Sequence, residues 1–262
     1  MRGKKLKIID THVHSIFRPT QFFENYRLMG VETLISVAYY PVVPNHSETL
    51  EDLFRWLIEL EPKRLQKIGI SGFCGIGIHP RSIPKHLNPT LYSRIEEYSQ
   101  SPEVVCLGEI GLEKGSKEEV EVLEKQLDIA INRNLPVILH TPGKNKREMT
   151  RKLIEILDSM TIRKIVIDHV TLENIDLVLN TEFYIGLTVQ LGKLSLEDFL
   201  QIIRQYGDNS NRFILNSDLG IDIAQDYIVP KAVNQMFMEK IEELKIESIS
   251  HKNAELLFQF NK

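Results

Sequence analysis

Six residues of types that bind metal ions stand at or just after the ends of short apolar runs in this sequence. Imidazole and carboxylate groups together suit Zn, Mn, Co, Fe or Ni, whereas Mg and Ca prefer ligands that are all oxygen. The six lie far apart along the chain, so only a fold that gathers the ends of these runs makes one site of them. They are His12, His14, Glu109, His140, His169 and Asp218.

The first two of these residues, His12 and His14, are separated by a single position. Residues two apart in a β-strand point to the same face, so both imidazoles can reach one cation. Six ligands exceed what one tetrahedral catalytic ion takes from a protein, and two ions about 3.5–4 Å apart, bridged by a carboxylate, fit the set better. We expect one or two divalent cations, Zn or Mn first and Mg, Co, Fe or Ni as alternatives, with Glu109 as the bridge.

Apolar runs rich in β-branched residues alternate with amphipathic segments along the chain. The helical spacing of apolar residues is clearest in 51–66 and 118–133. Apolar strands that alternate with helices are typical of a parallel sheet covered by helices. The eight expected strands are 6–10, 33–38, 72–78, 104–109, 137–140, 164–168, 183–189 and 213–217.

Eight strand–helix units favour a (β/α)8 TIM barrel, which commonly occupies about 250 residues as one domain. An open doubly wound sheet is the alternative, but the glycine-rich turn that normally follows its first strand is replaced here by His12 and His14. No linker or repeat divides the sequence, so we expect a single barrel domain over 1–262 that ends in a short closing helix over 253–260. In such a barrel the carboxyl ends of all strands meet at one face, where the six residues would converge.

Composition limits the class of protein. Hydrophobic residues at 42% and charged residues at 26% are typical of a globular chain, and a net charge of −4 argues against a surface that coats nucleic acid. The sequence has no secretory signal and no run of apolar residues long enough to cross a membrane. Its two cysteines, Cys74 and Cys106, lie within apolar runs. We expect a cytoplasmic protein that does not associate with membranes and has no obligate protein partner.

The candidate ligands belong to longer motifs. These are DTHVH at 10–14, GIHP at 77–80, GEIGL at 108–112 and LPVILH at 135–140, and the chain ends in NAELLF at 253–258. In these motifs, together with Asp218, the sequence resembles the TatD-type metal-dependent hydrolases of the amidohydrolase superfamily. The resemblance extends over nearly the whole chain.

The resemblance implies roles for the six residues. His12 and His14 would hold one ion, His140 and His169 would hold the other, and Glu109 would bridge the two. Asp218 would contact the first ion and the attacking water, so Glu109 and Asp218 would be the catalytic residues. The implied reaction is hydrolysis of phosphodiesters by a metal-bound hydroxide, as in a TatD-like deoxyribonuclease.

Three segments depart from the family pattern. The usual Glu-Thr-Asp-Ser/Ala-Pro run is replaced by NSDLG at 216–220, the common Gly-Leu-Asp-Tyr by GLEK at 111–114, and the common Ser-Arg after His140 by Thr141 and Pro142. Because such loops normally touch substrate, two other readings stay open. The protein is alternatively a lactone or amide hydrolase, which would use the same hydroxide on a carbonyl carbon, or a metal-binding scaffold without activity.

Three further residues are candidates for substrate binding. His79 directly follows the third expected strand, Lys144 follows His140, and Lys193 follows the seventh strand. Cationic side chains at this face would suit a phosphate group. The expected partner is therefore a small substrate, phosphate-containing or otherwise, or the end of a single-stranded DNA.

Overall fold

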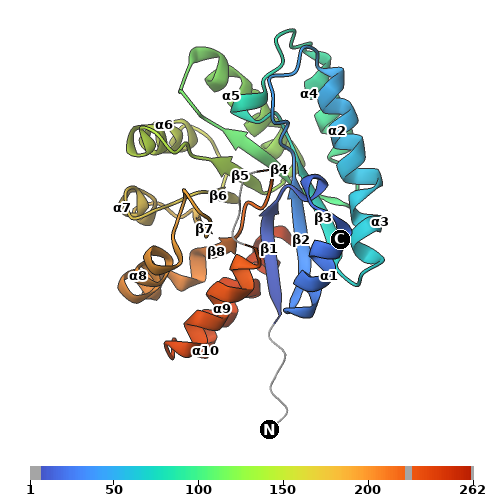
Figure 1. The fold of residues 1–262 in the computed structure, drawn as a ribbon. Coiled ribbons are helices and arrows are strands. Elements are labelled where there is room, and N and C mark those ends of the chain that lie inside the picture. Colours follow the sequence, from blue (N-terminus) through green and yellow to red (C-terminus); the bar gives the residue numbers. More distant parts are fainter. Residues whose placement is uncertain (1–6, 222–225, 261–262) are drawn as a thin grey trace.

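The structure, a computed structural model that describes residues 7–221 and 226–260, is a barrel of eight parallel strands surrounded by helices (Figure 1). Each strand pairs in parallel with the next one in the sequence, which confirms the expected (β/α)8 TIM barrel and excludes the doubly wound sheet. All eight expected strands are present. Their bounds are Ile8–Val13 (β1), Val31–Val37 (β2), Ser71–Ile76 (β3), Val104–Gly111 (β4), Val137–His140 (β5), Ile165–Ile167 (β6), Tyr184–Thr188 (β7) and Phe213–Asn216 (β8).

Helices follow the strands and cover the outside of the barrel. The helix expected over 118–133 is confirmed, whereas the one expected over 51–66 is two helices, because Pro62 has no N–H with which to continue the first one. The helices are Thr20–Leu28 (α1), Glu48–Glu59 (α2), Glu61–Gln66 (α3), Thr90–Tyr98 (α4), Lys117–Arg133 (α5), Lys146–Asp158 (α6), Ile175–Leu179 (α7), Leu196–Tyr206 (α8), Ile228–Met238 (α9), Glu243–Glu247 (α10) and Asn253–Phe258 (α11).

The first strand differs most from its expected bounds of 6–10. Residue 6 lies outside the described residues, and β1 continues to Val13, so that His12 is part of the strand. The polar side chains at its carboxyl end, Asp10 and His12, are fully buried. Buried polar groups are tolerated where they have partners, which these side chains find inside the barrel.

The barrel closes at the point where the candidate ligands gather. The Asp218 N–H donates to the His12 carbonyl at 2.8 Å, and the His14 N–H donates to the Leu219 carbonyl at 2.7 Å. The segment after β8 therefore continues the sheet against the end of β1. Closure and placement of His12, His14 and Asp218 depend on the same two backbone hydrogen bonds.

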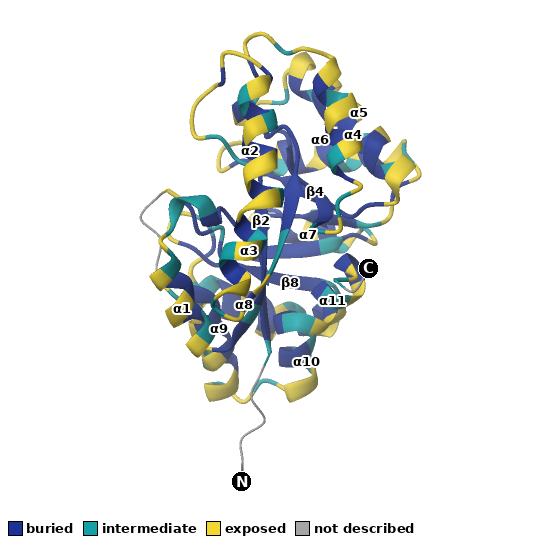
Figure 2. Ribbon diagram, turned by 90° about the vertical axis from the view of Figure 1, so that its right-hand side faces the viewer, coloured by how far each residue is buried: buried dark blue, intermediate teal, exposed yellow. Residues whose placement is uncertain are grey.

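The barrel has two separate apolar layers, one between the strands and the helices and one inside the barrel. Inward side chains such as Ile9, Val37 and Ile138 form the inner layer, and α11 covers it from the amino-terminal end with Leu257 and Phe258. Figure 2 shows buried strands at the centre and exposed residues on the outer faces of the helices. Within the described ranges, no helix combines the length and the apolar character needed to cross a bilayer.

Asn253 fixes this closing helix, and we predict that Asn253→Ala destabilises the barrel by about 1–3 kcal/mol. The buried Asn253 amide donates to the carbonyls of Ser210 and Phe213 at 2.7 and 2.8 Å, and its loss leaves both acceptors unpaired. Urea unfolding measures the change. Glu255→Gln, which only weakens a half-exposed ion pair with Lys7, is the control and should change the free energy of unfolding by less than about 1 kcal/mol. Equal effects of the two variants would contradict the prediction.

Candidate metal centre

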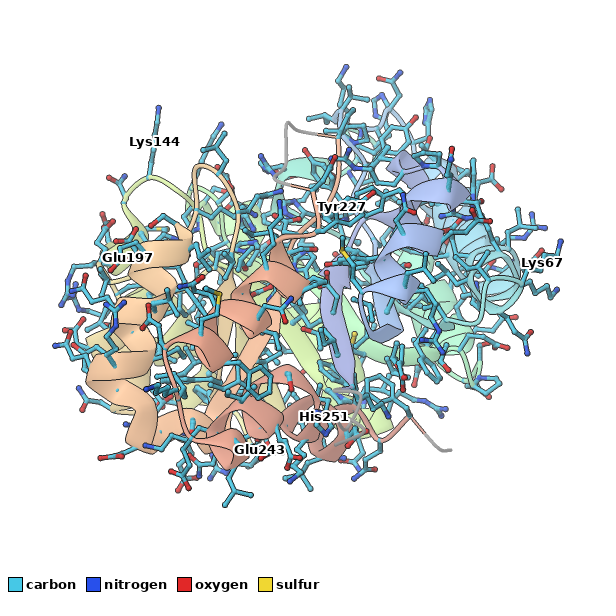
Figure 3. The ribbon with its side chains drawn as sticks, turned by 60° about the horizontal axis from the view of Figure 1, so that its bottom comes forward. Lys67, Lys144, Glu197, Tyr227, Glu243 and His251 are labelled. Atoms are coloured by element: carbon cyan, nitrogen blue, oxygen red, sulfur yellow. The ribbon has the colours of Figure 1, made fainter. Side chains whose placement is uncertain are left out.

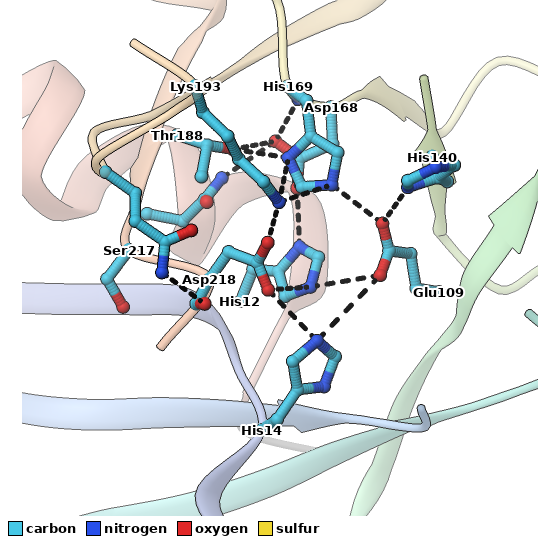
Figure 4. A network of polar contacts seen from close by, with 12 residues as sticks. His12, His14, Glu109, His140, Asp168, His169, Thr188, Lys193, Ser217 and Asp218 are labelled. Atoms are coloured by element: carbon cyan, nitrogen blue, oxygen red, sulfur yellow. Dashed lines mark hydrogen bonds and ion pairs between the residues drawn. The ribbon is translucent and has the colours of Figure 1, made fainter. Parts of the chain in front are cut away.

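One buried carboxylate, Glu109 at the end of β4, lies between two pairs of imidazoles (Figure 4). Its Oε1 atom is 2.7 Å from His140 Nδ1 and 2.8 Å from His169 Nε2. Its Oε2 atom is 3.3 Å from His12 Nε2 and 4.0 Å from His14 Nε2. Each oxygen therefore faces one pair of histidines, which is the arrangement expected of a carboxylate that bridges two cations.

His12, in β1, and His14, just after it, each have an oxygen acceptor at Nδ1. His12 Nδ1 lies 2.6 Å from Asp168 Oδ2, and His14 Nδ1 lies 3.0 Å from the Val37 carbonyl. A proton on each Nδ1 leaves Nε2 as the nitrogen with a free lone pair, and that atom points into the centre. Metal-binding histidines are typically fixed in this way.

The second pair of histidines is oriented by side chains. His140 Nε2 lies 2.9 Å from a Glu113 carboxylate oxygen, which leaves Nδ1 toward Glu109. His169 Nδ1 lies 2.8 Å from the Thr188 hydroxyl, which leaves Nε2 toward Glu109. All four imidazoles thus direct one nitrogen at the same carboxylate.

Asp218 completes the half of the centre that contains His12 and His14. Its Oδ1 atom is 3.0 Å from His14 Nε2 and 3.4 Å from His12 Nε2, and its other oxygen pairs with Lys193. Gln190 donates to the Asp218 carbonyl at 3.0 Å. The carboxylate is therefore placed both to bind a cation and to contact a water beside it.

His12 provides a test of whether a cation fits. Among the described residues, its Nε2 atom has no hydrogen-bond partner, although the side chain is fully buried. A buried polar atom without a partner costs free energy, so such an atom aimed at two carboxylates indicates a missing ligand. The donor set of neutral imidazole and carboxylate fits a divalent transition metal, and groups such as His12, His14 and Glu109 are close enough to share one.

The charges of the centre agree with this interpretation. Burial lowers the pKa of His14 and His169 to about 3, so both are neutral, as metal ligands must be. Burial also lowers the pKa of His12, but the Glu109 and Asp168 carboxylates outweigh it and raise the pKa to about 9. Burial opposes ionisation of Glu109, yet His12 and His140 hold its pKa well below the usual value. A positive charge next to Glu109 is thus favoured, and a divalent cation would supply it.

His79 reaches the same carboxylate, with Nε2 3.4 Å from Glu109 Oε2, but differs from the other histidines in its second nitrogen. His79 Nδ1 accepts a hydrogen bond from the Arg81 N–H at 3.0 Å, so the proton of the neutral ring is on Nε2. Burial lowers the pKa of this imidazole to about 3, which keeps the ring neutral. His79 is therefore suited to donate a hydrogen bond to a substrate oxygen and not to bind a metal.

Comparison with known proteins identifies the family. A family model described as TatD related DNase matches residues 9–259. The chain belongs to the TatD family of metal-dependent hydrolases. It is 36% identical over 250 residues to a protein of Methanocaldococcus jannaschii named an uncharacterized metal-dependent hydrolase, and the match covers 94% of this chain and 98% of the relative.

Solved structures agree with this membership. The TatD-like protein of Archaeoglobus fulgidus superposes with a TM-score of 0.79 at 36% identity, over 96% of this chain and 99% of that one. The phosphotriesterase homology protein of Escherichia coli, solved with phosphate in its active site, gives a TM-score of 0.70 over 98% of this chain and 100% of that one. At 14% identity the latter shows likeness of fold alone.

The TatD-family barrel thus brings together all six residues expected to bind metal, and His79 and Lys193 lie beside them. Lys144 is exposed and projects away from the barrel (Figure 3). Lys146, two positions later, is buried instead and donates to the His169 carbonyl at 2.8 Å. Lys146 turns inward as the first residue of α6, whereas Lys144 lies in the loop before it, and residue spacing did not predict that difference.

Residues that orient the ligands were not identified from the sequence. Asp168 holds His12 and also accepts from the His169 N–H, the Thr188 hydroxyl and the Asn216 amide, so its oxygens are used for positioning. Thr188 could have been found, because it ends β7 just as the ligands end other strands. Asp10 accepts from Ser217 and so positions the segment that carries Asp218, with no contact to a ligand imidazole among the hydrogen bonds of the described residues.

If Glu109 bridges two cations, two matched glutamine variants should behave differently. We expect Glu109→Gln to lose at least one of two metal equivalents per chain, because the amide cannot bridge two cations. We expect Glu113→Gln, which changes only the support of His140, to keep both equivalents with affinity lowered about 10- to 100-fold. Elemental analysis and chelator competition measure the two effects, with circular dichroism to verify folding. A folded Glu109→Gln protein with unchanged metal content would contradict the assigned role.

Proposed function

We propose that this chain hydrolyses phosphodiesters, as a nuclease acting on DNA ends does, at the centre around Glu109. The observation that carries the proposal is a cavity of about 340 Å³ over the centre. His140 and His169 form part of its wall, where the three cationic groups of Arg81, Lys146 and Lys193 outnumber the carboxylates of Glu113 and Glu173. Cations beside a metal centre favour an anionic substrate, whereas a neutral lactone or amide has no use for them.

The ligands divide into two sites. Divalent cations held by His12 and His14 on one side of Glu109, and by His140 and His169 on the other, would lower the pKa of a bound water and polarise the phosphoryl oxygen. We propose Zn or Mn as the metal, because both accept imidazole and carboxylate ligands.

The chain's own groups supply the remaining steps. Asp218, beside His14, is placed to orient the attacking water, accept its proton and pass a proton to the leaving oxygen. His79 donates its Nε2–H to a phosphoryl oxygen. Lys146 donates to the Thr141 hydroxyl and the His169 carbonyl, and its third N–H is available to the phosphate.

Side-chain nucleophiles do not compete with this mechanism. Cys74 and Cys106 are buried free thiols, and burial raises the pKa of both. A buried, protonated thiol is a poor nucleophile. We also propose a reducing, cytoplasmic setting for the protein, because both thiols lie unpaired within the strands.

Assays on bis(p-nitrophenyl) phosphate and on single-stranded oligonucleotides test the proposal. We expect hydrolysis with Mn or Zn bound, loss of activity on removal of the metal with chelator, and recovery when the metal is returned. Turnover of a lactone or amide, with none of any phosphodiester, would replace this proposal by the carbonyl reaction. A metal-loaded protein inactive on all of them would indicate a scaffold.

Asp218→Asn separates catalysis from binding. The amide keeps the size and one ligand oxygen of the side chain but cannot accept the proton, so we expect kcat to fall about 10²- to 10⁴-fold. The melting temperature and metal content should stay near those of the unchanged protein. An unchanged kcat would refute the role assigned to Asp218.

The buried lysine predicts a pH dependence. Burial, and then the charge of Lys193, lowers the pKa of Lys146 to about 8, so Lys146 is cationic below this pH and neutral above it. We expect kcat/KM for an anionic substrate to fall as pH rises through about 8. Lys146→Met should lack this alkaline limb and lose about 10- to 100-fold in kcat/KM at pH 7, since a charged hydrogen bond contributes about 1.5–3 kcal/mol.

Lys144→Met provides the comparison, because Lys144 lies two residues before Lys146 and is exposed. If the phosphate is bound as proposed here, only Lys146→Met changes the pH profile. If only Lys144→Met changes the pH profile, Lys144 contacts the phosphate, as expected from the sequence, and Lys146 does not.

A further inference from the structure

A second hollow lies beside the metal centre, between the loop after β1, the loop after β2 and helix α2. Its volume is about 1030 Å³, at the upper end of the range for small-molecule sites. Aromatic side chains from all three segments line it: Phe17, Tyr40 and Trp56. The loop after β2 and the start of α2 rise above the carboxyl ends of the first strands, the face that carries the metal ligands (Figure 1).

The hollow and the centre share a wall. The ring of Phe17, which lines the hollow, lies 6.5 Å from the His14 ring. Tyr39, the neighbour of Tyr40, lies 5.1 Å from the His14 ring and 5.0 Å from the His79 ring. A ligand whose reacting group is at Glu109 can therefore place an adjoining group in the hollow.

Trp56 is held in position although 49% of it is exposed. Its Nε1–H donates to Glu61 at 3.1 Å, and the buried Glu61 carboxylate is fixed in turn by Arg64 and the Ser15 hydroxyl at 2.5 Å each. Ser15 follows His14 directly in the chain. A buried charge thus ties an exposed indole to the segment that carries a metal ligand, which gives the hollow a preorganised aromatic face.

The phosphate cavity combines three cationic groups with two carboxylates, whereas the hollow has a different set of charges. Among the described residues that line the hollow, none is lysine or arginine, whereas Glu48 and Asp52 contribute carboxylates. Carboxylates repel a phosphate but accept hydrogen bonds from amino groups. Aromatic side chains stack on nucleobases with about 1–3 kcal/mol per base.

We propose that this hollow, lined by Phe17, Tyr40 and Trp56, binds the nucleobase next to the phosphate that is hydrolysed. Among nucleotide phosphodiesters, those with an amino-bearing base next to the cleaved phosphate are then the preferred substrates. This inference rests on the proposed function, since it takes the phosphate to be at the metal centre.

Two esters with the same leaving group test the inference on the metal-loaded protein. One is the p-nitrophenyl ester of deoxyadenosine 5′-monophosphate, and the other is methyl p-nitrophenyl phosphate, which has no base. We expect kcat/KM to favour the nucleotide ester about 10- to 100-fold, the equivalent of stacking one base. Hydrolysis of neither ester would refute the proposed function, whereas equal rates would refute the base site and leave the proposed function standing.

Trp56→Ala should remove most of this preference. Trp56→Phe, which keeps a ring for stacking, should keep most of it and guards against loss through misfolding. Leu60→Ala is the matched control, because Leu60 is an exposed apolar residue just after α2 and outside the hollow. An unchanged preference in Trp56→Ala would overturn the assignment.

Binding without turnover gives an independent readout, because Trp56 is the one tryptophan of the sequence. Deoxyadenosine monophosphate should quench its fluorescence in a saturable way, whereas deoxyribose 5-phosphate and inorganic phosphate should not. The absence of quenching, or equal quenching by all three, would count against the proposal. A wild-type dimer that dissociates in Trp56→Ala would show instead that a second copy covers this surface.

Discussion

The centre depends on one buried carboxylate whose two oxygens are approached by five imidazoles. Glu109 has its oxygens 2.7–3.3 Å from nitrogens of His140, His169 and His12. In a buried site such charges interact strongly, so small displacements change the energy greatly. A closed barrel suits this demand, because each candidate ligand lies in a strand or within two residues of its end, and the strands are fixed by hydrogen bonds to their neighbours. The bonds that close the barrel, from Asp218 to His12 and from His14 to Leu219, place the ligands as they complete the sheet.

Polar groups around the centre fix the orientation of the imidazoles as well as their position. Asp168 connects three strand ends, since it contacts His12 from β1, Thr188 from β7 and Asn216 from β8. This carboxylate lies so close to β7 that a Cβ added at Gly186 would meet Asp168 Oδ1 at 2.1 Å. Glycine is therefore needed at that position. The distance between the strands at this end of the barrel thus accommodates the polar network around Asp168 as well as the packing of the apolar core.

The strand order and the convergence of the six candidate ligands could be predicted from the sequence because both follow simple rules. Apolar runs alternate with amphipathic segments, and the carboxyl ends of parallel strands meet at one face, so His12 and Asp218 had to be neighbours in a barrel. The helix break at Pro62 was also predictable from the sequence, because proline interrupts the hydrogen bonds of a helix. The prediction of one helix over 51–66 was therefore wrong. Lys146 and Trp56 could not be predicted. Their roles depend on which way a loop turns and on a buried partner such as Glu61, and neither follows from residue spacing.

Two positions that carry ligands adopt backbone conformations that side chains usually avoid. His169 and Asp218 have φ values of 58° and 47°, which cost about 1–3 kcal/mol each unless the surroundings enforce them. Both follow the last residues of their strands, where a left-handed turn directs the side chain toward the barrel axis instead of continuing the alternation of the strand. The His169 N–H donates to Asp168 at 2.9 Å and the Asp218 N–H donates to His12 at 2.8 Å. The two backbone conformations are thus maintained by His12 itself and by Asp168, which orients it. Backbone strain at two ligands and the orientation of a third are therefore one coupled feature, which ties the metal centre to the closure of the barrel.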